Sequence, residues 1–290
     1  MTPPAPDTES PASLAPGLYI VATPIGNLGD LSPRAAATLA QVAVIAAEDS
    51  RVTAKLLHHI GVRVPMLAYH DHTDTGVRAG LVARALSAPV ALVSDAGTPL
   101  ISDPGYKLVR DARAAGVNVV TIPGPCAAIA ALTLAGLPTD RFLFAGFLPA
   151  KAGARATAIA ELAGVRATLV LYESGPRLAA SLAALATGLG NRDAAVAREV
   201  TKRFEECITG RLSELAARYA DAAPRGEIVI TIAPPGDPAP ADAATLDAAL
   251  AAALADGSVK SAVALVSAML GLPRAQVYAR ALELKGGRGR

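Results

Sequence analysis

The sequence has no tryptophan, and aromatic residues make up only 3 % of its 290 residues. Large rings usually dominate the area buried in a core, so this core must instead be built from closely packed aliphatic side chains. Alanine supplies much of the 52 % hydrophobic fraction. The net charge of +2 permits an anionic partner but does not require one, as a strongly basic domain would.

Cysteine and histidine are also scarce. The two cysteines, Cys126 and Cys207, lie far apart, which excludes a disulfide framework and is typical of a cytosolic protein. The four histidines show no spacing that resembles a zinc site. In His70-Asp71-His72 two rings would share one side of a strand, but this alone is weak support for a metal. We therefore expect no metal ion.

No apolar run is long enough to cross a membrane. The longest, Cys126 to Leu137, stops at Pro138 and is shorter than the ~18 residues that a span requires. Residues 1–16 are rich in proline, alanine and serine, without a basic start or an apolar block. We expect residues 1–17 to form a disordered tail rather than a signal peptide, in a cytoplasmic protein with no membrane partner.

Apolar stretches of strand length alternate with helical patterns in the first part of the chain. Strands are predicted at 18–22, 42–47, 90–94 and 117–122. This rhythm is typical of βαβ units and a mostly parallel sheet. The second half has closely spaced strand candidates, which indicate a mixed or antiparallel sheet. They lie at 142–145, 168–172, 194–198, 206–209 and 227–233.

The segment Pro123-Gly124-Pro125 interrupts the first pattern and predicts a domain boundary. We therefore expect an α/β protein with one α/β domain at 18–122 and a second at 123–235. A proline-rich linker follows, and the last part, 242–290, reads as a helical module of about three helices.

Residues 94–105, Ser-Asp-Ala-Gly-Thr-Pro-Leu-Ile-Ser-Asp-Pro-Gly, form the most informative loop. They lie between a predicted strand and a predicted helix. In open α/β sheets small ligands bind just beyond the carboxyl ends of strands. Gly97 and Gly105 let the backbone approach a ligand, and Pro99 and Pro104 stiffen the loop. A ligand site is the favoured interpretation, and a well-made turn is the alternative.

Two further loops, 23–30 and 123–126, also follow predicted strands. If those strands are parallel, all three loops lie at one edge of the sheet. Ser32 and Pro33 are typical of a helix start after the first loop. A helix directly after the second would present free N–H groups to a ligand. The chain has no Gly-x-Gly-x-x-Gly or Walker motif there, which disfavours a dinucleotide or a triphosphate.

Charged residues follow strands of the second half. Arg177, Arg198, Lys202 and Arg203 could bind phosphates, although an ion-pair network is the alternative for each of them. In an extended segment Arg198 and Lys202 would share one face, and Glu199 and Arg203 the other. No Ser-His-Asp constellation is suggested.

Several motifs, in order, resemble those of the ribosomal small subunit methyltransferase I family, within the tetrapyrrole-methylase superfamily. They are residues 22–28, 46–51, 70–72, 94–105, 123–127, 146–149, 172–174 and 198–202. The resemblance covers residues 18 to about 233. The stretch 272–282 is also similar to that family's helical appendage.

The resemblance implies two α/β domains with a cofactor cleft between them and a small C-terminal helical module. It implies a homodimer that uses S-adenosylmethionine to methylate the ribose 2′-hydroxyl of a cytidine in the decoding region of 16S rRNA of the small ribosomal subunit. The implied cofactor-binding residues are Pro24, Ile25, Asp95, Gly97, Thr98, Ile101, Cys126, Ala127 and Tyr172.

Methyl transfer to a ribose hydroxyl is an in-line displacement in which the protein supplies position and electrostatics. The hydroxyl is a poor nucleophile, so a base or a cation beside the developing alkoxide would help. The candidates are Glu173, Glu199, Lys202 and Asp103, and Lys202→Ala is expected to lower turnover strongly. Many relatives carry a histidine where this chain has Pro176, so a histidine base is unavailable there.

The candidate RNA-binding residues are Arg51, Arg177, Arg198 and Arg203. With so few rings to stack on bases, phosphate contacts and RNA shape should dominate recognition. Methylation of a tetrapyrrole or another small substrate is an alternative, and so is a non-catalytic RNA-binding protein of ribosome assembly. The basic cluster at 198–203 and the C-terminal module favour RNA.

Overall fold

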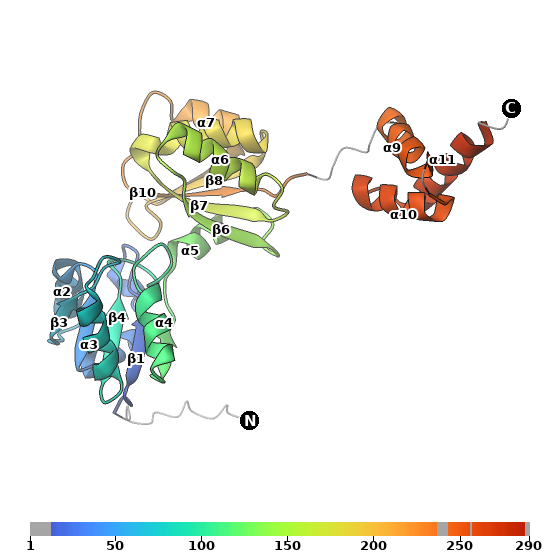
Figure 1. Cartoon of the computed structure of the whole chain (residues 1–290). Helices are drawn as coiled ribbons and strands as arrows, with labels where there is room; N and C mark the ends of the chain where they lie inside the picture. The colour runs from blue at the N-terminus through green and yellow to red at the C-terminus, as the bar shows by residue number, and fades with distance from the viewer. Residues whose placement is uncertain (1–12, 237–242, 256, 288–290) are drawn as a thin grey trace, which may run out of the picture. The chain divides into compact units, whose positions relative to one another are not determined.

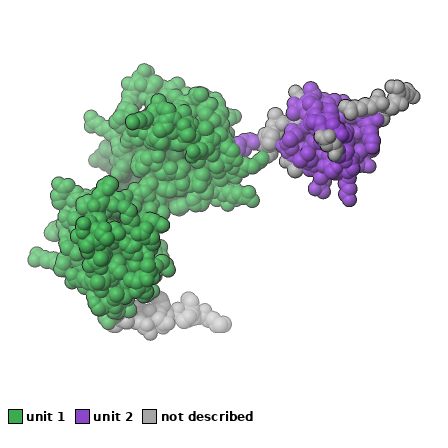
Figure 2. All heavy atoms as spheres, viewed as in Figure 1, with its two compact units in different colours: residues 1–234 green, residues 235–290 purple. Residues whose placement is uncertain are grey.

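The computed structural model describes residues 13–236, 243–255 and 257–287 (Figure 1). The chain divides into two compact units, residues 1–234 and 235–290 (Figure 2). Most of the expected N-terminal tail lies outside the described residues, and the first strand already begins at Gly17. The boundary that we expect between residues 122 and 123, within the first unit, stays a prediction.

A five-stranded sheet forms the first part of the first unit, in the order β3-β2-β4-β1-β5. All its neighbouring strands are parallel, as the alternating pattern predicts. The strands are β1 (Gly17–Val21), β2 (Val44–Ala47), β3 (Met66–Ala68), β4 (Pro89–Val93) and β5 (Val119–Ile122). We did not predict β3, because three residues are too few to show a periodic pattern.

Helices cover both faces of this sheet. They are the short η1 (Leu28–Asp30), α1 (Pro33–Gln41), α2 (Ser50–His59), α3 (Thr75–Ala85) and α4 (Tyr106–Ala114). Leu18 and Ile20 of β1 pack in one core cluster, and Tyr19 packs in another on the opposite face. Ser32 caps α1 as predicted, since its hydroxyl accepts the N–H of Ala35 at 3.1 Å. A parallel sheet covered on both faces leaves the strand ends free for ligands.

The second sheet has five strands in the order β6-β7-β10-β8-β9. Strands β6 and β7 are parallel and the other pairs antiparallel, so the predicted mixed sheet is confirmed. The strands are β6 (Phe142–Phe147), β7 (Thr168–Ser174), β8 (Asp193–Arg198), β9 (Glu206–Arg211) and β10 (Glu227–Ile232). The accompanying helices are α6 (Ala152–Leu162), α7 (Gly175–Leu189) and α8 (Leu212–Arg218).

Helix α5 (Ala127–Leu134) lies between the two sheets (Figure 1). One face of the second sheet packs on α6, α7 and α8, with Leu169 and Leu171 in that core. The other face packs on α5 through Val170 and Val229, in a cluster that also contains Ile25 from the loop after β1. This shared cluster brings the strand ends of the first sheet against the second sheet.

The second unit contains three described helices, the number that the sequence predicts. They are α9 (Ala243–Ala255), α10 (Val259–Leu270) and α11 (Arg274–Gly287). Leu250 and Val277 are fully buried in its own small core. Across the described part of the chain, no helix is both long and apolar enough to cross a membrane.

Candidate functional site

The loops after β1, β4 and β5 meet at one edge of the first sheet, because these three strands are neighbours. Thr23 and Gly97 exchange two backbone hydrogen bonds, from Thr23 N to Gly97 O at 2.8 Å and from Gly97 N to Thr23 O at 3.1 Å. The Thr98 hydroxyl donates to the carbonyl oxygen of Pro125 at 2.9 Å. These loops, residues 23–30, 94–105 and 123–126, are called the loop wall below.

The backbone of residues 94–105 adopts unusual conformations. Gly97 has φ +81°, and a Cβ atom there would lie 3.1 Å from the Ile25 side chain. Leu100 and Ser102 have φ of 75° and 62°, in the left-handed region that side chains disfavour. Backbone held in such conformations is concentrated at binding and active sites.

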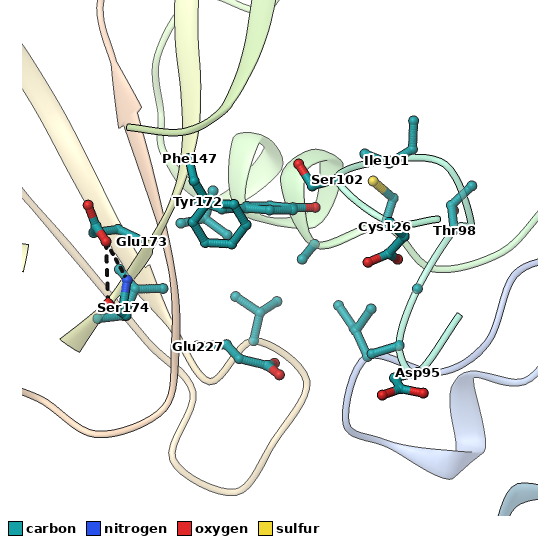
Figure 3. A pocket seen from close by; sticks show the side chains of 18 of the residues that line it. Asp95, Thr98, Ile101, Ser102, Cys126, Phe147, Tyr172, Glu173, Ser174 and Glu227 are labelled. Carbon is teal, nitrogen blue, oxygen red and sulfur yellow. Dashed lines mark hydrogen bonds between the residues drawn. The ribbon is translucent and has the colours of Figure 1, made fainter. Parts of the chain in front are cut away.

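A cavity of about 440 Å³ lies between the loop wall and the second sheet (Figure 3). This volume falls within the range of small-molecule sites. The implied cofactor residues that line it are Ile25, Asp95, Gly97, Thr98, Ile101, Cys126, Ala127 and Tyr172. Pro24 is next to Ile25 in the chain but is not among the lining residues. The cavity therefore brings together eight of the nine residues that the resemblance implies.

Among the carboxyl groups that line the cavity are those of Glu48, Asp95 and Asp103, on the side of the first sheet. The pKa of Asp103 is raised to about 6, chiefly by burial; a hydrogen bond with Ser94 opposes the shift, and the nearby Glu48 and Asp95 add to it. Burial and Asp95 likewise raise the pKa of Glu48. Asp95 accepts the backbone N–H of Asp49 at 2.8 Å. Asp103 is thus mostly ionised at neutral pH but takes up a proton more readily than an exposed aspartate.

An aromatic group forms part of the opposite side of the cavity. The Tyr172 ring makes edge contacts with Phe144, at 4.8 Å between centroids, and with Phe147, at 5.6 Å. The Tyr172 hydroxyl oxygen accepts the backbone N–H of Ala128 at 3.2 Å. Burial raises the pKa of Tyr172 above its ordinary value, so the hydroxyl stays protonated. Tyr172 therefore connects β7 to the N-terminus of α5.

Glu173 lines the cavity but is occupied by contacts inside the second sheet's own structure. It is 3 % exposed, and it accepts the Ser174 backbone N–H at 2.8 Å and the Ser181 hydroxyl at 2.6 Å. Arg177 forms an ion pair with it at 3.3 Å and also donates to the carbonyl oxygen of Leu148. Both residues thus have an internal structural role. The sequence predicts instead that Glu173 takes part in catalysis and that Arg177 contacts RNA.

The segment after β8 turns instead of remaining extended. Lys202 N donates to Glu199 O at 2.9 Å, and Glu199 and Thr201 have φ of 52° and 70°. The predicted faces are therefore wrong: the Lys202 ammonium contacts Glu199 at 3.0 Å and Glu227 at 3.1 Å. Its hydrogen bond to Glu199 lowers the pKa of that carboxyl. Neither Glu199 nor Lys202 is among the lining residues of the cavity.

The other candidate RNA-binding residues differ in the solvent exposure of their side chains and in their ion-pair partners. The Arg51 side chain is 86 % exposed and pairs with Asp49 at 2.6 Å. Arg198 pairs with Glu206 at 3.2 Å and is largely covered. Arg203 is exposed, with its guanidinium carbon 5.7 Å from the centroid of the Phe204 ring. Arg51 and Arg203 thus present the most accessible charge of this group.

Sequence reasoning missed several lining residues of the cavity. They are Glu48, Phe147, Ser174, Val200 and residues 226–229, whereas Ala96 and Ser102 lie in the loop 94–105 that the sequence predicts as a ligand site. Glu48 and Phe147 lie in motifs that carry the family resemblance, so that signal could have found them. Residues 226–229 reach the cavity because β10 lies between β7 and β8, which no local pattern reveals. Within the described ranges, no group of three or more His, Cys, Asp or Glu side chains could hold a metal.

The sequence profile of the Tetrapyrrole (Corrin/Porphyrin) Methylases matches residues 17–216, and that of the RsmI C-terminal HTH domain matches residues 240–285. The fold resembles the crystal structure of uroporphyrin-III C-methyl transferase from Thermus thermophilus complexed with S-adenyl homocysteine. The TM-score is 0.51 at 21 % identity, over 74 % of this chain and 96 % of that one. The predicted fold class is confirmed.

Two curated relatives carry the name ribosomal RNA small subunit methyltransferase I. The protein of Erythrobacter litoralis is 53 % identical, over 96 % of this chain and 98 % of its own length. The protein of Mesorhizobium japonicum is 48 % identical, over 96 % of each chain. The chain belongs to the tetrapyrrole methylase family and, within it, to the ribosomal RNA small subunit methyltransferase I family.

Proposed function

We propose that this protein transfers the methyl group of S-adenosylmethionine to the ribose 2′-oxygen of a cytidine in the 16S rRNA of the small ribosomal subunit. The observation that carries the proposal is the cavity of about 440 Å³ between the loop wall and the second sheet. It occurs in a chain about half identical to proteins named as small-subunit rRNA methyltransferases.

The cavity fits S-adenosylmethionine in size and in chemistry. The loop wall offers a backbone group at Gly97 and an apolar side chain at Ile25, and Ala127 at the start of α5 adds a further backbone group. Asp95 and Glu48 add negative charge, which complements a cofactor with a positively charged sulfur. When bound, this cofactor supplies an electrophilic methyl group, and the protein supplies orientation and electrostatics.

Asp103 is the best-placed proton acceptor among the four candidates. It lines the cavity, and its pKa of about 6 lies near neutral pH, where a general base is most efficient. Glu173 is held by Ser181 and Arg177, and Glu199 and Lys202 bind each other outside the lining. In the proposed reaction Asp103 accepts the proton of the 2′-hydroxyl as the oxygen attacks the methyl group.

RNA recognition and dimerisation are further parts of the proposal. The exposed Arg51 and Arg203 supply phosphate contacts, and the helical module of the second unit adds a second RNA-binding surface. Exposed apolar side chains of α5, Ile129 and Leu134, offer surface for a second copy of the chain. Sedimentation of the purified protein tests the homodimer.

The deciding experiment offers methyl-labelled S-adenosylmethionine with 30S subunits, with free 16S rRNA and with a porphyrin precursor. We expect label in 30S subunits or 16S rRNA, at one cytidine ribose found by nuclease mapping. Label in the porphyrin precursor alone would replace the proposal with small-substrate methylation. Cofactor binding without transfer to any substrate would favour a non-catalytic assembly protein.

A further inference from the structure

Phe147 is a large apolar residue that is both exposed and on the cavity wall. It is the last residue of β6 and lines the cavity, yet it is 55 % exposed. The chain has only four phenylalanines, and nothing in its core requires this one. An apolar ring left in contact with water on a cavity wall loses the stabilisation that burial gives, so its place calls for a ligand that covers it.

The backbone directs the Phe147 side chain through an irregularity in β6. The pairing of β6 with β7 shifts register between Phe144 and Gly146, and Gly146 has φ +63°. Such a bulge re-aims the side chains that follow it. A Cβ atom on Gly146 would lie 3.3 Å from the Ser102 hydroxyl, so this end of β6 lies against the loop wall. The irregularity therefore turns Phe147 toward the cavity.

The ring is also held firmly from behind. Its edge contact with Tyr172 has an interplanar angle of 64°. The next residue, Leu148, is buried and its carbonyl oxygen accepts a hydrogen bond from Arg177, which pairs with the buried Glu173. A ring fixed before binding loses little conformational entropy when a partner covers it. Figure 3 shows Phe147 beside Tyr172, across the cavity from Thr98 and Cys126.

We propose that the Phe147 ring is a platform on which the base of the target nucleotide stacks. This inference rests on the proposed function, because a ribose can reach the cavity only if its nucleotide is unstacked from the RNA. An aromatic ring binds an unstacked base of any sequence through its flat face. The platform belongs to the second sheet, opposite the loop wall to which we assign the cofactor. It therefore holds the substrate in place, while other groups select the base.

The test replaces the flat ring while keeping its apolar volume. In Phe147→Leu the KM for 30S subunits should rise about ten-fold, the loss typical of one stacked base. The Kd for S-adenosylmethionine, measured by calorimetry, and the melting temperature should stay near those of the wild type. Phe147→Trp should have a KM near that of the wild type, because an indole ring stacks on a base at least as well as a phenyl ring. Phe142→Leu is the matched control, since Phe142 is 44 % exposed on the same strand but does not line the cavity.

Each other outcome overturns the inference. An unchanged KM in Phe147→Leu, beside an active wild type, removes the stacking role and leaves the proposed function standing. A weakened cofactor Kd would assign the ring to the cofactor instead. A Phe147→Trp variant as impaired as Phe147→Leu would indicate a packing role. A wild type that transfers no methyl to 30S subunits would refute the proposed function, and the stacking role with it.

Discussion

The two sheets of the first unit contribute to the cavity in different ways. The parallel sheet contributes only the loops after its strands, which form the loop wall with its glycines, prolines and small side chains. The mixed sheet contributes residues of the strands themselves, such as Phe147, Tyr172 and Val229. One side is therefore formed by loop residues, whereas the other is formed mainly by strand residues.

This difference arises from how each sheet is covered. Helices cover both faces of the first sheet, so only its carboxyl edge can meet a ligand. The second sheet reaches the cavity with its strand ends, through side chains such as Phe147 and Tyr172. We therefore expect the loop wall to determine cofactor affinity and to supply the base Asp103, and the second sheet to hold the substrate in place. Four predictions test that division.

The largest effect is expected from Asp103→Asn. Without the proposed base, turnover on 30S subunits should fall about 100-fold or more. The wild-type rate should decline as pH falls through about 6, because protonated Asp103 cannot accept the hydroxyl proton. The variant should lack this decline. Single-turnover rates between pH 5 and 9 measure both, and a variant with the wild-type pH profile would exclude Asp103 as the base.

Stability measurements on the same variant provide a control. The folded-state pKa of Asp103, about 6, lies above its ordinary value of 3.8, so folding favours the protonated form. The contribution of the Asp103 carboxyl to the stability of the folded state is fully present below pH 3.8 and is lost as pH rises through about 6. Asp103→Asn should therefore melt at a higher temperature than the wild type at pH 8, with the difference fading toward pH 4. A less stable variant at pH 8 would contradict this sign.

The next largest effect should come from Gly97→Val, on the loop wall. The added side chain meets Ile25 and fills space beside the cavity, which should weaken S-adenosylmethionine binding about 10- to 100-fold in calorimetry. Gly116→Val is the matched control, because Gly116 has φ +77° but no atom within 4 Å of an added Cβ. Equal losses of affinity in both variants would point to backbone strain rather than to the site.

Removing residues 235–290 tests whether the second unit contributes to substrate binding but not to cofactor binding. The truncated protein should bind S-adenosylmethionine normally, since every lining residue of the cavity lies in the first unit. Its affinity for 30S subunits should fall by about ten-fold, as expected when one of two linked binding surfaces is lost. Filter binding measures this change. A truncated protein with full affinity and full turnover would show that the module has no part in recognition.

The smallest effect on turnover is expected from Lys202→Ala, for which the sequence and the structure give different predictions. A cation that stabilises the alkoxide would make Lys202→Ala nearly inactive, which is the sequence-based prediction. The two ion pairs with Glu199 and Glu227 instead predict a slightly lower melting temperature, since such pairs contribute about 1 kcal/mol or less. Turnover would then change only a few-fold. Lys202→Met, which keeps the apolar stem, separates lost charge from lost packing.

Sequence reasoning succeeded where the decisive information is local. The loop 94–105 could be found because its glycines and prolines restrict the backbone directly, and Ser32 because a helix cap needs only its own first turn. It failed where distant segments decide. The buried Glu173 is held by Ser181 on the following helix, and the turn after β8 is joined to β10 by the hydrogen bond from Glu199 N to Glu227 O.

The cross-links within the loop wall have a consequence for binding thermodynamics. The paired backbone bonds between Thr23 and Gly97, and the bond from Thr98 to Pro125, order three separate loops when the chain folds. The loops lose their conformational entropy when the chain folds, so they lose little more of it when a ligand binds. Ligand association with such a surface should need no slow rearrangement and should proceed in a single kinetic phase.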